Sequence, residues 1–158
     1  MFPPGILGTR ADILIDIVML SFIIILPLLV ISWRLARVKK DYALHRKIQI
    51  TLGVSLAVVV SIFEYDLSMS GGIFELTKGG IYEGTAILLW TIYIHTAFAV
   101  LAAVIWTGLI ISSMIKFDNP PQPNSFSKIH RVLGRAGMIT MIGAGTTAPP
   151  LYYFGFMV

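Results

Sequence analysis

The chain has 158 residues, of which 56% are hydrophobic and 13% are charged. A soluble domain normally carries about 25% charged residues, because its surface has to be compatible with water. The composition therefore excludes a soluble globular domain and indicates an integral membrane protein. The chain has no cysteine, which excludes disulfides, iron–sulfur clusters, thiolate metal sites and cysteine nucleophiles.

Four apolar runs approach the roughly 20 residues that a helix needs to cross a bilayer. They predict helical spans at about residues 13–33, 46–66, 85–115 and 129–150. The spans have to be helical because an isolated strand cannot pair its backbone in lipid, and the runs lack the alternation of a membrane barrel. The predicted fold class is all-α: residues 1–158 form one transmembrane domain, an integral membrane four-helix bundle.

The end of the last span carries two further signals. Pro149 and Pro150 are expected to kink or end its helix, because proline lacks the backbone N–H that a helix uses. The aromatic residues that follow are expected to form a belt at the membrane interface; they are Tyr152, Tyr153, Phe154 and Phe156.

The basic residues predict the orientation of the spans. All but two of the 12 Lys and Arg residues lie between the uncharged stretches of the first and second runs or between those of the third and fourth. The exceptions are Arg10 and Lys78. By the positive-inside rule, both basic links face the cytoplasm and both termini lie outside. The net charge of +4 then reflects topology and does not indicate a nucleic-acid partner.

The dipeptide His-Arg opens both the second and the fourth run, at His45 and His130. This suggests a parallel repeat of two helix pairs related by a pseudo-twofold axis, with both histidines at the same depth. Two such imidazoles suit the axial positions of one haem iron, or a metal shared with Gln49, which lies on the same helix face as His45. The alternative is that the two dipeptides contact lipid headgroups and bind no cofactor.

A second polar layer is predicted at the outer ends of the spans. Glu64 and Asp66 end the second run, and His95 lies within the third. Two carboxylates and an imidazole suit iron, manganese or zinc, so these three residues form a candidate metal site. Glu64 and Asp66 are about 200° apart on an ideal helix, so only one of them is expected to face the bundle fully. A structural hydrogen bond is the alternative role for His95.

Two further acids, Asp12 and Asp16, share one face at the start of the first run. They belong to the same outer layer and add hard oxygen ligands to it. The alternative is that they lie among the outer headgroups with Asp66 and pair with Arg10 or Lys78.

The pattern as a whole resembles a bacterial family of small four-helix membrane proteins of largely uncharacterised function. The family includes a maturation factor required for haem-A-containing cytochrome oxidases in Gram-positive bacteria. The resemblance is carried by His45-Arg46, by Tyr93-Ile94-His95, by Ile129-His130-Arg131 and by the polar aromatic end of the second run, Phe63-Glu64-Tyr65-Asp66. It covers about residues 13–153.

The resemblance implies that His45, His95 and His130 are the shared histidines. The maturation factor has a fourth histidine at the outer end of the second span, where this chain has Glu64 and Asp66. That difference argues against an outer bis-histidine haem and favours a carboxylate–histidine metal site, or no site, in the outer layer. The resemblance also implies a multi-pass protein of the bacterial cytoplasmic (inner) membrane.

Three functional hypotheses follow, and the sequence leaves open whether the protein is an enzyme. The first is a metal- or haem-handling accessory protein of the respiratory membrane that aids cytochrome oxidase assembly, with haem or a transition metal (iron, copper, manganese or zinc) as cofactor. The second is a membrane redox enzyme with a metal at Glu64, Asp66 and His95.

The third hypothesis is a non-catalytic scaffold subunit. It would pack on a larger membrane complex through small residues of the last span, namely Gly134, Gly137, Gly143 and Gly145. The expected partners are the lipid bilayer, cytochrome oxidase subunits or another membrane complex, and a second copy in a homodimer.

Overall fold

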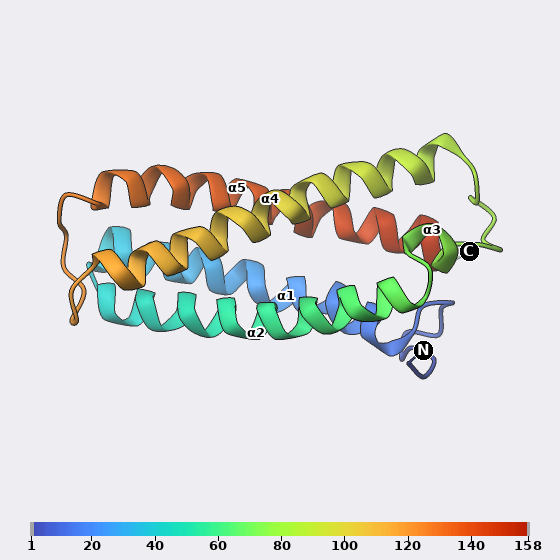
Figure 1. Ribbon diagram of the computed structural model, residues 1–158, viewed down its shortest axis with the longest axis horizontal. Helices are drawn as coiled ribbons and strands as arrows, with labels where there is room; N and C mark the ends of the chain where they lie inside the picture. The colour runs from blue at the N-terminus through green and yellow to red at the C-terminus, as the bar shows by residue number, and fades with distance from the viewer. Residues whose placement is uncertain (1, 158) are drawn as a thin grey trace.

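The computed structural model describes residues 2–157 and contains four long helices. Figure 1 shows them running side by side along the length of the molecule. They are α1 (Ile13–Arg34), α2 (Tyr42–Met69), α4 (Ala86–Lys116) and α5 (Ser127–Tyr152). No named strand occurs within residues 2–157, so the predicted all-α character is confirmed.

Three short helical segments complete the order of elements. The π-helical segments η1 (Leu35–Lys39) and η2 (Tyr153–Met157) continue α1 and α5, and α3 (Ile73–Leu76) lies in the connection between α2 and α4. The helix pairs α4–α5, α1–α2, α1–α5 and α2–α4 are all in contact.

The molecule has two different ends (Figure 1). We call one the terminal end: it holds α3 and the described ends of the chain. We call the other the hairpin end: it holds the link from α1 to α2 and the link from α4 to α5.

Side-chain caps define the start of three of the long helices. The Oδ1 atom of Asp12 accepts hydrogen bonds from the backbone N–H groups of Leu14 and Ile15, both at 2.9 Å. Asp41 and Thr85 cap α2 and α4 in the same way. Such caps satisfy N–H groups that the first turn of a helix leaves unpaired.

The exterior of the helices is apolar. Large aliphatic side chains are exposed along them, such as Ile23 at 68%, Val104 at 67% and Ile139 at 65%. Three helical stretches are long and apolar enough to cross a membrane, namely Ile13–Lys39, Tyr42–Met69 and Ala86–Lys116. The protein is therefore a helical protein with several membrane-capable helices, and lipid is the solvent that such an exterior suits.

Helix α5 is rich in glycine and threonine, and its small residues allow close packing inside the chain. A Cβ atom at Gly143 would lie 2.4 Å from the Phe98 ring of α4, and one at Gly145 would lie 2.8 Å from Leu26 of α1. Gly134 and Gly137 likewise face α4. The glycines that sequence analysis offered as a surface for a larger complex are thus occupied by the chain's own helices.

The observed helices extend beyond the predicted spans at several ends, and the prolines do not end α5. Pro149 and Pro150 lie inside the helix, which reaches Tyr152 and continues as η2. The expected end at the prolines is wrong because tertiary contacts hold this segment: Tyr152 is 5% exposed, and the carbonyl of Phe156 accepts a 2.9 Å hydrogen bond from the backbone N–H of Arg10.

The predicted aromatic belt is wrong for two of its four members. Tyr152 and Phe156 are buried together with Ala11 and Ile15 in a cluster at the terminal end. Tyr153 is 43% exposed, as a belt residue would be. The aromatic residues after the prolines therefore divide between the core and the surface, because η2 packs against the start of α1.

Asp16 is the centre of the terminal end and is fully buried. Its Oδ2 atom accepts a 2.9 Å hydrogen bond from the backbone N–H of Leu7, and the Tyr152 hydroxyl donates to Oδ1. The same hydroxyl bonds Thr9 Oγ1 at 2.7 Å. These bonds fasten the N-terminal segment and α5 to α1. The alternative that Asp16 lies among lipid headgroups is therefore wrong. Asp12 is half-buried and caps the start of α1.

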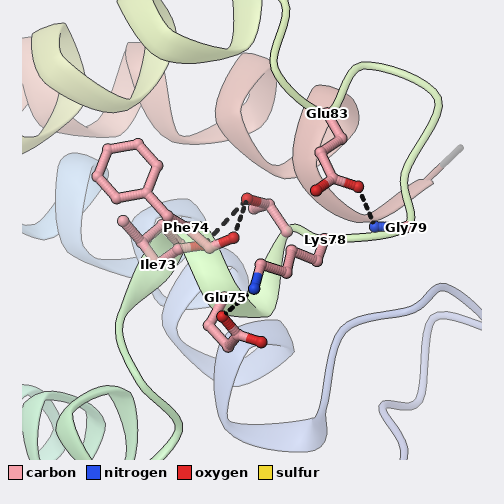
Figure 2. Close-up of polar contacts among 7 residues, drawn as sticks. Ile73, Phe74, Glu75, Lys78, Gly79 and Glu83 are labelled. Carbon is pink, nitrogen blue, oxygen red and sulfur yellow. Dashed lines mark hydrogen bonds and ion pairs between the residues drawn. The ribbon is translucent and has the colours of Figure 1, made fainter.

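The α2–α4 connection also covers the terminal end. Figure 2 shows the Lys78 ammonium bonded to Glu75 at 2.5 Å and the Glu83 carboxylate accepting the N–H of Gly79 at 2.7 Å. The hydrogen bond from Lys78 to Glu75 raises the pKa of Lys78, with the charge of Glu75 adding to it. Arg10 donates to the carbonyl of Lys78, which joins this connection to the N-terminal segment.

The buried Asp16–Tyr152 bond predicts a stability effect. Replacing Tyr152 by Phe leaves the Oδ1 atom of Asp16 without that donor, which should cost about 1–3 kcal/mol. The thermal unfolding midpoint in mild detergent should fall by roughly 2–10 °C. Tyr153→Phe is the matched control, since the neighbouring tyrosine is exposed, and it should leave the midpoint unchanged. Equal midpoints for the two variants would contradict the role given to Tyr152.

Candidate functional site

A cavity of about 390 Å³ lies at the hairpin end, between the α1–α2 pair and the α4–α5 pair. This volume is within the range of small-molecule and cofactor pockets, about 300–1,000 Å³. Its walls are mainly apolar and include Leu29, Ile50, Leu109 and Met141. A small set of polar side chains interrupts this apolar surface, which is the usual make-up of a ligand pocket.

Both predicted histidines line this cavity. His45 is the fourth residue of α2 and His130 is the fourth residue of α5, so the two rings enter at equivalent helix positions. Their ring centres are 6.1 Å apart and their planes are nearly perpendicular, at 89°. The structure therefore brings together the two residues that sequence analysis paired.

Ser32 of α1 determines which nitrogen of His45 carries the proton. His45 Nδ1 lies 3.0 Å from the backbone carbonyl oxygen of Ser32 and 2.8 Å from its Oγ. A carbonyl oxygen only accepts, so Nδ1 has to be the protonated nitrogen. Ser32 is fully buried, and the arrangement keeps Nε2 of His45 as the nitrogen with a free lone pair.

Ser113 of α4 does the same for His130. The Ser113 hydroxyl donates to the carbonyl of Leu109 at 2.6 Å and lies 3.0 Å from His130 Nδ1. Its single hydrogen is used on the carbonyl, so its oxygen accepts from Nδ1–H of His130. The ring also contacts Phe117 and Phe126 edge-on, with centres 5.3 and 6.2 Å away. Position and tautomer of His130 are both fixed.

The Nε2 atoms of the two rings are the nitrogens left for a ligand. Among residues 2–157 the hydrogen bonds of both rings involve Nδ1. No buried side-chain nitrogen or oxygen lacks a partner in that range. Each Nε2 therefore opens onto accessible space and not onto packed side chains. A histidine held through Nδ1–H with Nε2 free is the usual arrangement of a metal-binding imidazole.

Gln49 supports His45 indirectly. Its Nε2 donates to Ser32 Oγ at 3.0 Å, and its Oε1 accepts from the indole N–H of Trp106 at 2.8 Å. The chain of bonds from Trp106 through Gln49 and Ser32 to His45 thus joins α4, α2 and α1. Gln49 lines the cavity and contacts Ser32, so its geometry is that of a positioning residue.

The cavity lining has a strong charge bias. It includes five basic residues and, within the described chain, no acidic residue. The basic residues are Arg37, Lys40, Arg46, Arg131 and Arg135. The hairpin end therefore combines an apolar pocket, two neutral imidazoles and a positive rim.

The predicted outer metal site is not assembled in this structure. No group of three or more His, Asp or Glu side chains close enough to hold a metal ion occurs within residues 2–157. Asp66 is buried at 5% exposure, whereas Glu64, about 200° away around the helix, is exposed. The expectation that only one of the two faces inward is confirmed, and the inward residue is Asp66.

His95 makes a structural hydrogen bond. Its Nδ1 lies 3.0 Å from the hydroxyl of Thr147 on α5, and that hydroxyl is also bonded to the carbonyl of Gly143. The cavity beside it is about 60 Å³, which is too small for an organic cofactor. The cavity beside His95 is therefore much smaller than the one at the hairpin end.

The residues that orient the histidines, Ser32 and Ser113, were not predicted from the sequence, because their hydroxyls are not ionisable. Each serine lies near the end of the helix that precedes a histidine-bearing helix. The available signal was a repeated serine: in each hairpin a serine lies near the end of the first helix, before the His-Arg dipeptide of the second.

Comparison of the chain with family models, with curated proteins and with solved structures finds no match.

The serine–histidine bonds predict a spectroscopic change. In Ser113→Ala, Nδ1 of His130 loses its acceptor, so its ring should become a mixture of the two neutral tautomers. Nitrogen-15 NMR of histidine-labelled protein in detergent measures this directly. Ser112→Ala is the control, because the neighbouring serine is not part of the cavity lining, and it should keep the Nδ1–H form. A tautomer unchanged in Ser113→Ala would contradict the assignment.

Proposed function

We propose that the protein is a haem-handling accessory protein of the respiratory membrane. The observation that carries the proposal is the pair His45 and His130, each held through Nδ1 by a serine, lining one cavity with ring centres 6.1 Å apart. Two imidazoles that share one metal ion, with each nitrogen about 2 Å from it, have ring centres roughly 6 Å apart.

The residues present fit a haem better than a bare metal ion. Two imidazoles alone are few ligands for zinc or manganese, which take four or more. His45 and His130 would, by contrast, be enough to hold the iron of a haem, whose macrocycle supplies the remaining ligands. Bound there, haem would supply one-electron chemistry or be carried as cargo. The apolar walls of the 390 Å³ cavity suit a macrocycle's faces.

The chain's own residues hold the rings in a state ready to bind. Because Ser32 and Ser113 engage Nδ1 of the two rings, Nε2 is the nitrogen that the neutral form of each ring would offer to a ligand. Gln49 and Trp106 fix Ser32 in turn. Packing of Phe117 and Phe126 on His130 restricts the ring's rotation. This preorganisation lowers the entropy cost of ordering these side chains when a ligand binds.

The membrane arrangement we propose is four spans with the hairpin end at the cytoplasmic face. Helix α5, the least apolar of the four, would be the span shielded by its neighbours, in line with its buried small residues. The equivalent pairs Ser32–His45 and Ser113–His130 support a parallel repeat of two helix hairpins. Both chain ends would then lie outside, in a bacterial cytoplasmic membrane.

The proposed role in cytochrome oxidase assembly rests on the resemblance to the maturation-factor family. A haem site at the cytoplasmic side of a small membrane protein is consistent with holding or passing on haem for a larger enzyme. The alternative of a redox enzyme requires three metal ligands close together, at Glu64, Asp66 and His95. No such cluster occurs within residues 2–157. The scaffold alternative loses the glycine surface on which it was based.

The central test is haem binding by the purified protein in mild detergent. Added iron protoporphyrin should give a Soret band with the low-spin features of bis-histidine ligation. His45→Ala and His130→Ala should each abolish those features, because each removes one axial nitrogen. Absorbance spectroscopy checks this.

His95→Ala is the matched control, since it changes the third histidine without touching the cavity. It should keep the wild-type spectrum. A low-spin spectrum that survives both His45→Ala and His130→Ala, or the absence of any Soret change in the wild type, would sink the proposal.

The topology has its own test, which the absence of native cysteines makes simple. Ile81→Cys places a thiol in the α2–α4 connection, and Ser125→Cys places one in the α4–α5 link; both positions are exposed. In intact cells, a membrane-impermeant maleimide should label Ile81→Cys and should label Ser125→Cys only after the membrane is permeabilised. The reverse pattern would mean the opposite orientation.

A further inference from the structure

Two of the basic residues that line the hairpin-end cavity, Arg131 and Arg135, lie within α5. The positive-inside rule accounts for the sign of these charges, but not for their position beside the cavity. Arg135 is about 7.5 Å further along the helix than His130, at 1.5 Å per residue. Both side chains are exposed, and in the membrane arrangement proposed above a cation at the depth of Arg135 would be costly.

These two arginines have no counter-charge within the described chain. Arg46 donates to the carbonyl of Asp118 at 3.1 Å, and Arg37 lies over the Trp33 ring at 5.0 Å. Arg131 and Arg135, in contrast, make no hydrogen bond or ion pair with residues 2–157. Both line the cavity, and no acidic side chain from the described helices does.

The geometry of α5 puts the two guanidinium groups on one side of the pocket. Arg131 and Arg135 are one helical turn apart, so they share a face. His130 is next to Arg131 and lines the same cavity. A ligand coordinated through His130 would therefore have its periphery beside both arginines. Guanidinium groups bind carboxylate or phosphate oxygens through two parallel hydrogen bonds.

We propose that the ligand held between His45 and His130 carries anionic oxygen groups, which Arg131 and Arg135 bind. The ligand class is thus an amphipathic macrocycle with free carboxylates, an iron porphyrin diacid, bound with its carboxylate edge against α5. This inference rests on the proposed haem function and adds that the site selects a macrocycle with free carboxylates. The same anionic chemistry could be offered by a phospholipid headgroup, and the test separates the two sources.

The experiment compares two porphyrins in nanodiscs of phosphatidylcholine, which has no net charge. Iron protoporphyrin has two carboxylates, and its dimethyl ester has none. The wild type should bind the diacid at least about tenfold more tightly than the ester, as expected for loss of charge-assisted hydrogen bonds. Arg131→Gln/Arg135→Gln should lose this preference with the Soret maximum unchanged, because the axial histidines remain.

Lys47→Gln/Lys128→Gln is the control for general surface charge. Both lysines are exposed at the hairpin end, and neither lines the cavity. This variant removes the same net charge and should keep the wild-type preference. Arg131→Lys/Arg135→Lys guards against misfolding of the glutamine variant: it keeps the charge and loses the planar fork, and it should retain part of the preference.

The outcomes distinguish this inference from the function on which it rests. If wild type and Arg131→Gln/Arg135→Gln both give the bis-histidine spectrum and bind acid and ester equally, the arginine proposal is overturned while haem binding stands. If the wild type binds neither porphyrin, the proposed haem function is wrong. Native mass spectrometry with phosphatidylglycerol then tests whether the two arginines bind an anionic lipid. Lipid retained by wild type and the lysine variant but lost by the arginine variant supports the anion site; equal retention in all three overturns it.

Discussion

The structure depends on one constraint: a polar group among these apolar helices has to find its partner within the chain. Water cannot supply it in a hydrocarbon environment, where an unsatisfied group costs several kcal/mol. Within residues 2–157 every buried side-chain nitrogen and oxygen has a partner. The fully buried residues Asp16 and Ser32 show the consequence most clearly, because each ties two helices or a helix and a loop together. Polar atoms that open onto space are therefore the exceptions that indicate a ligand.

The two ends of the molecule meet this constraint differently. At the terminal end, Leu7 and Thr9 of the N-terminal segment bond the polar groups of Asp16 and Tyr152, which also bond each other. At the hairpin end, Ser32 and Ser113 use one nitrogen of each histidine and leave the other facing a cavity. The closed end stabilises the helix arrangement, and the open end is where we place the function. The positive rim adds charge selection to that opening.

Sequence reasoning succeeded where a local pattern carries the information. Apolar runs located the four long helices, and the repeated His-Arg dipeptide pointed to His45 and His130. It failed where a tertiary contact overrides a local preference, as at Pro149, which α5 passes because Tyr152 is anchored on α1. For the outer layer it left alternatives open, and the structure turns Glu64 outward and bonds His95 to Thr147.

By itself, the sequence determined that this is a helical, cysteine-free membrane-type chain with its basic residues in two links and its histidines at repeated positions. Composition and spacing are enough for that, because they act through local helix geometry and solvent preference. Only the tertiary structure decided which polar groups meet. It paired serines with histidines 13 and 17 residues away. It also turned Asp66 inward and Glu64 outward, and it placed Arg131 and Arg135 beside the cavity. Those outcomes depend on how the helices rotate and pack against one another, and one-dimensional spacing does not contain that information.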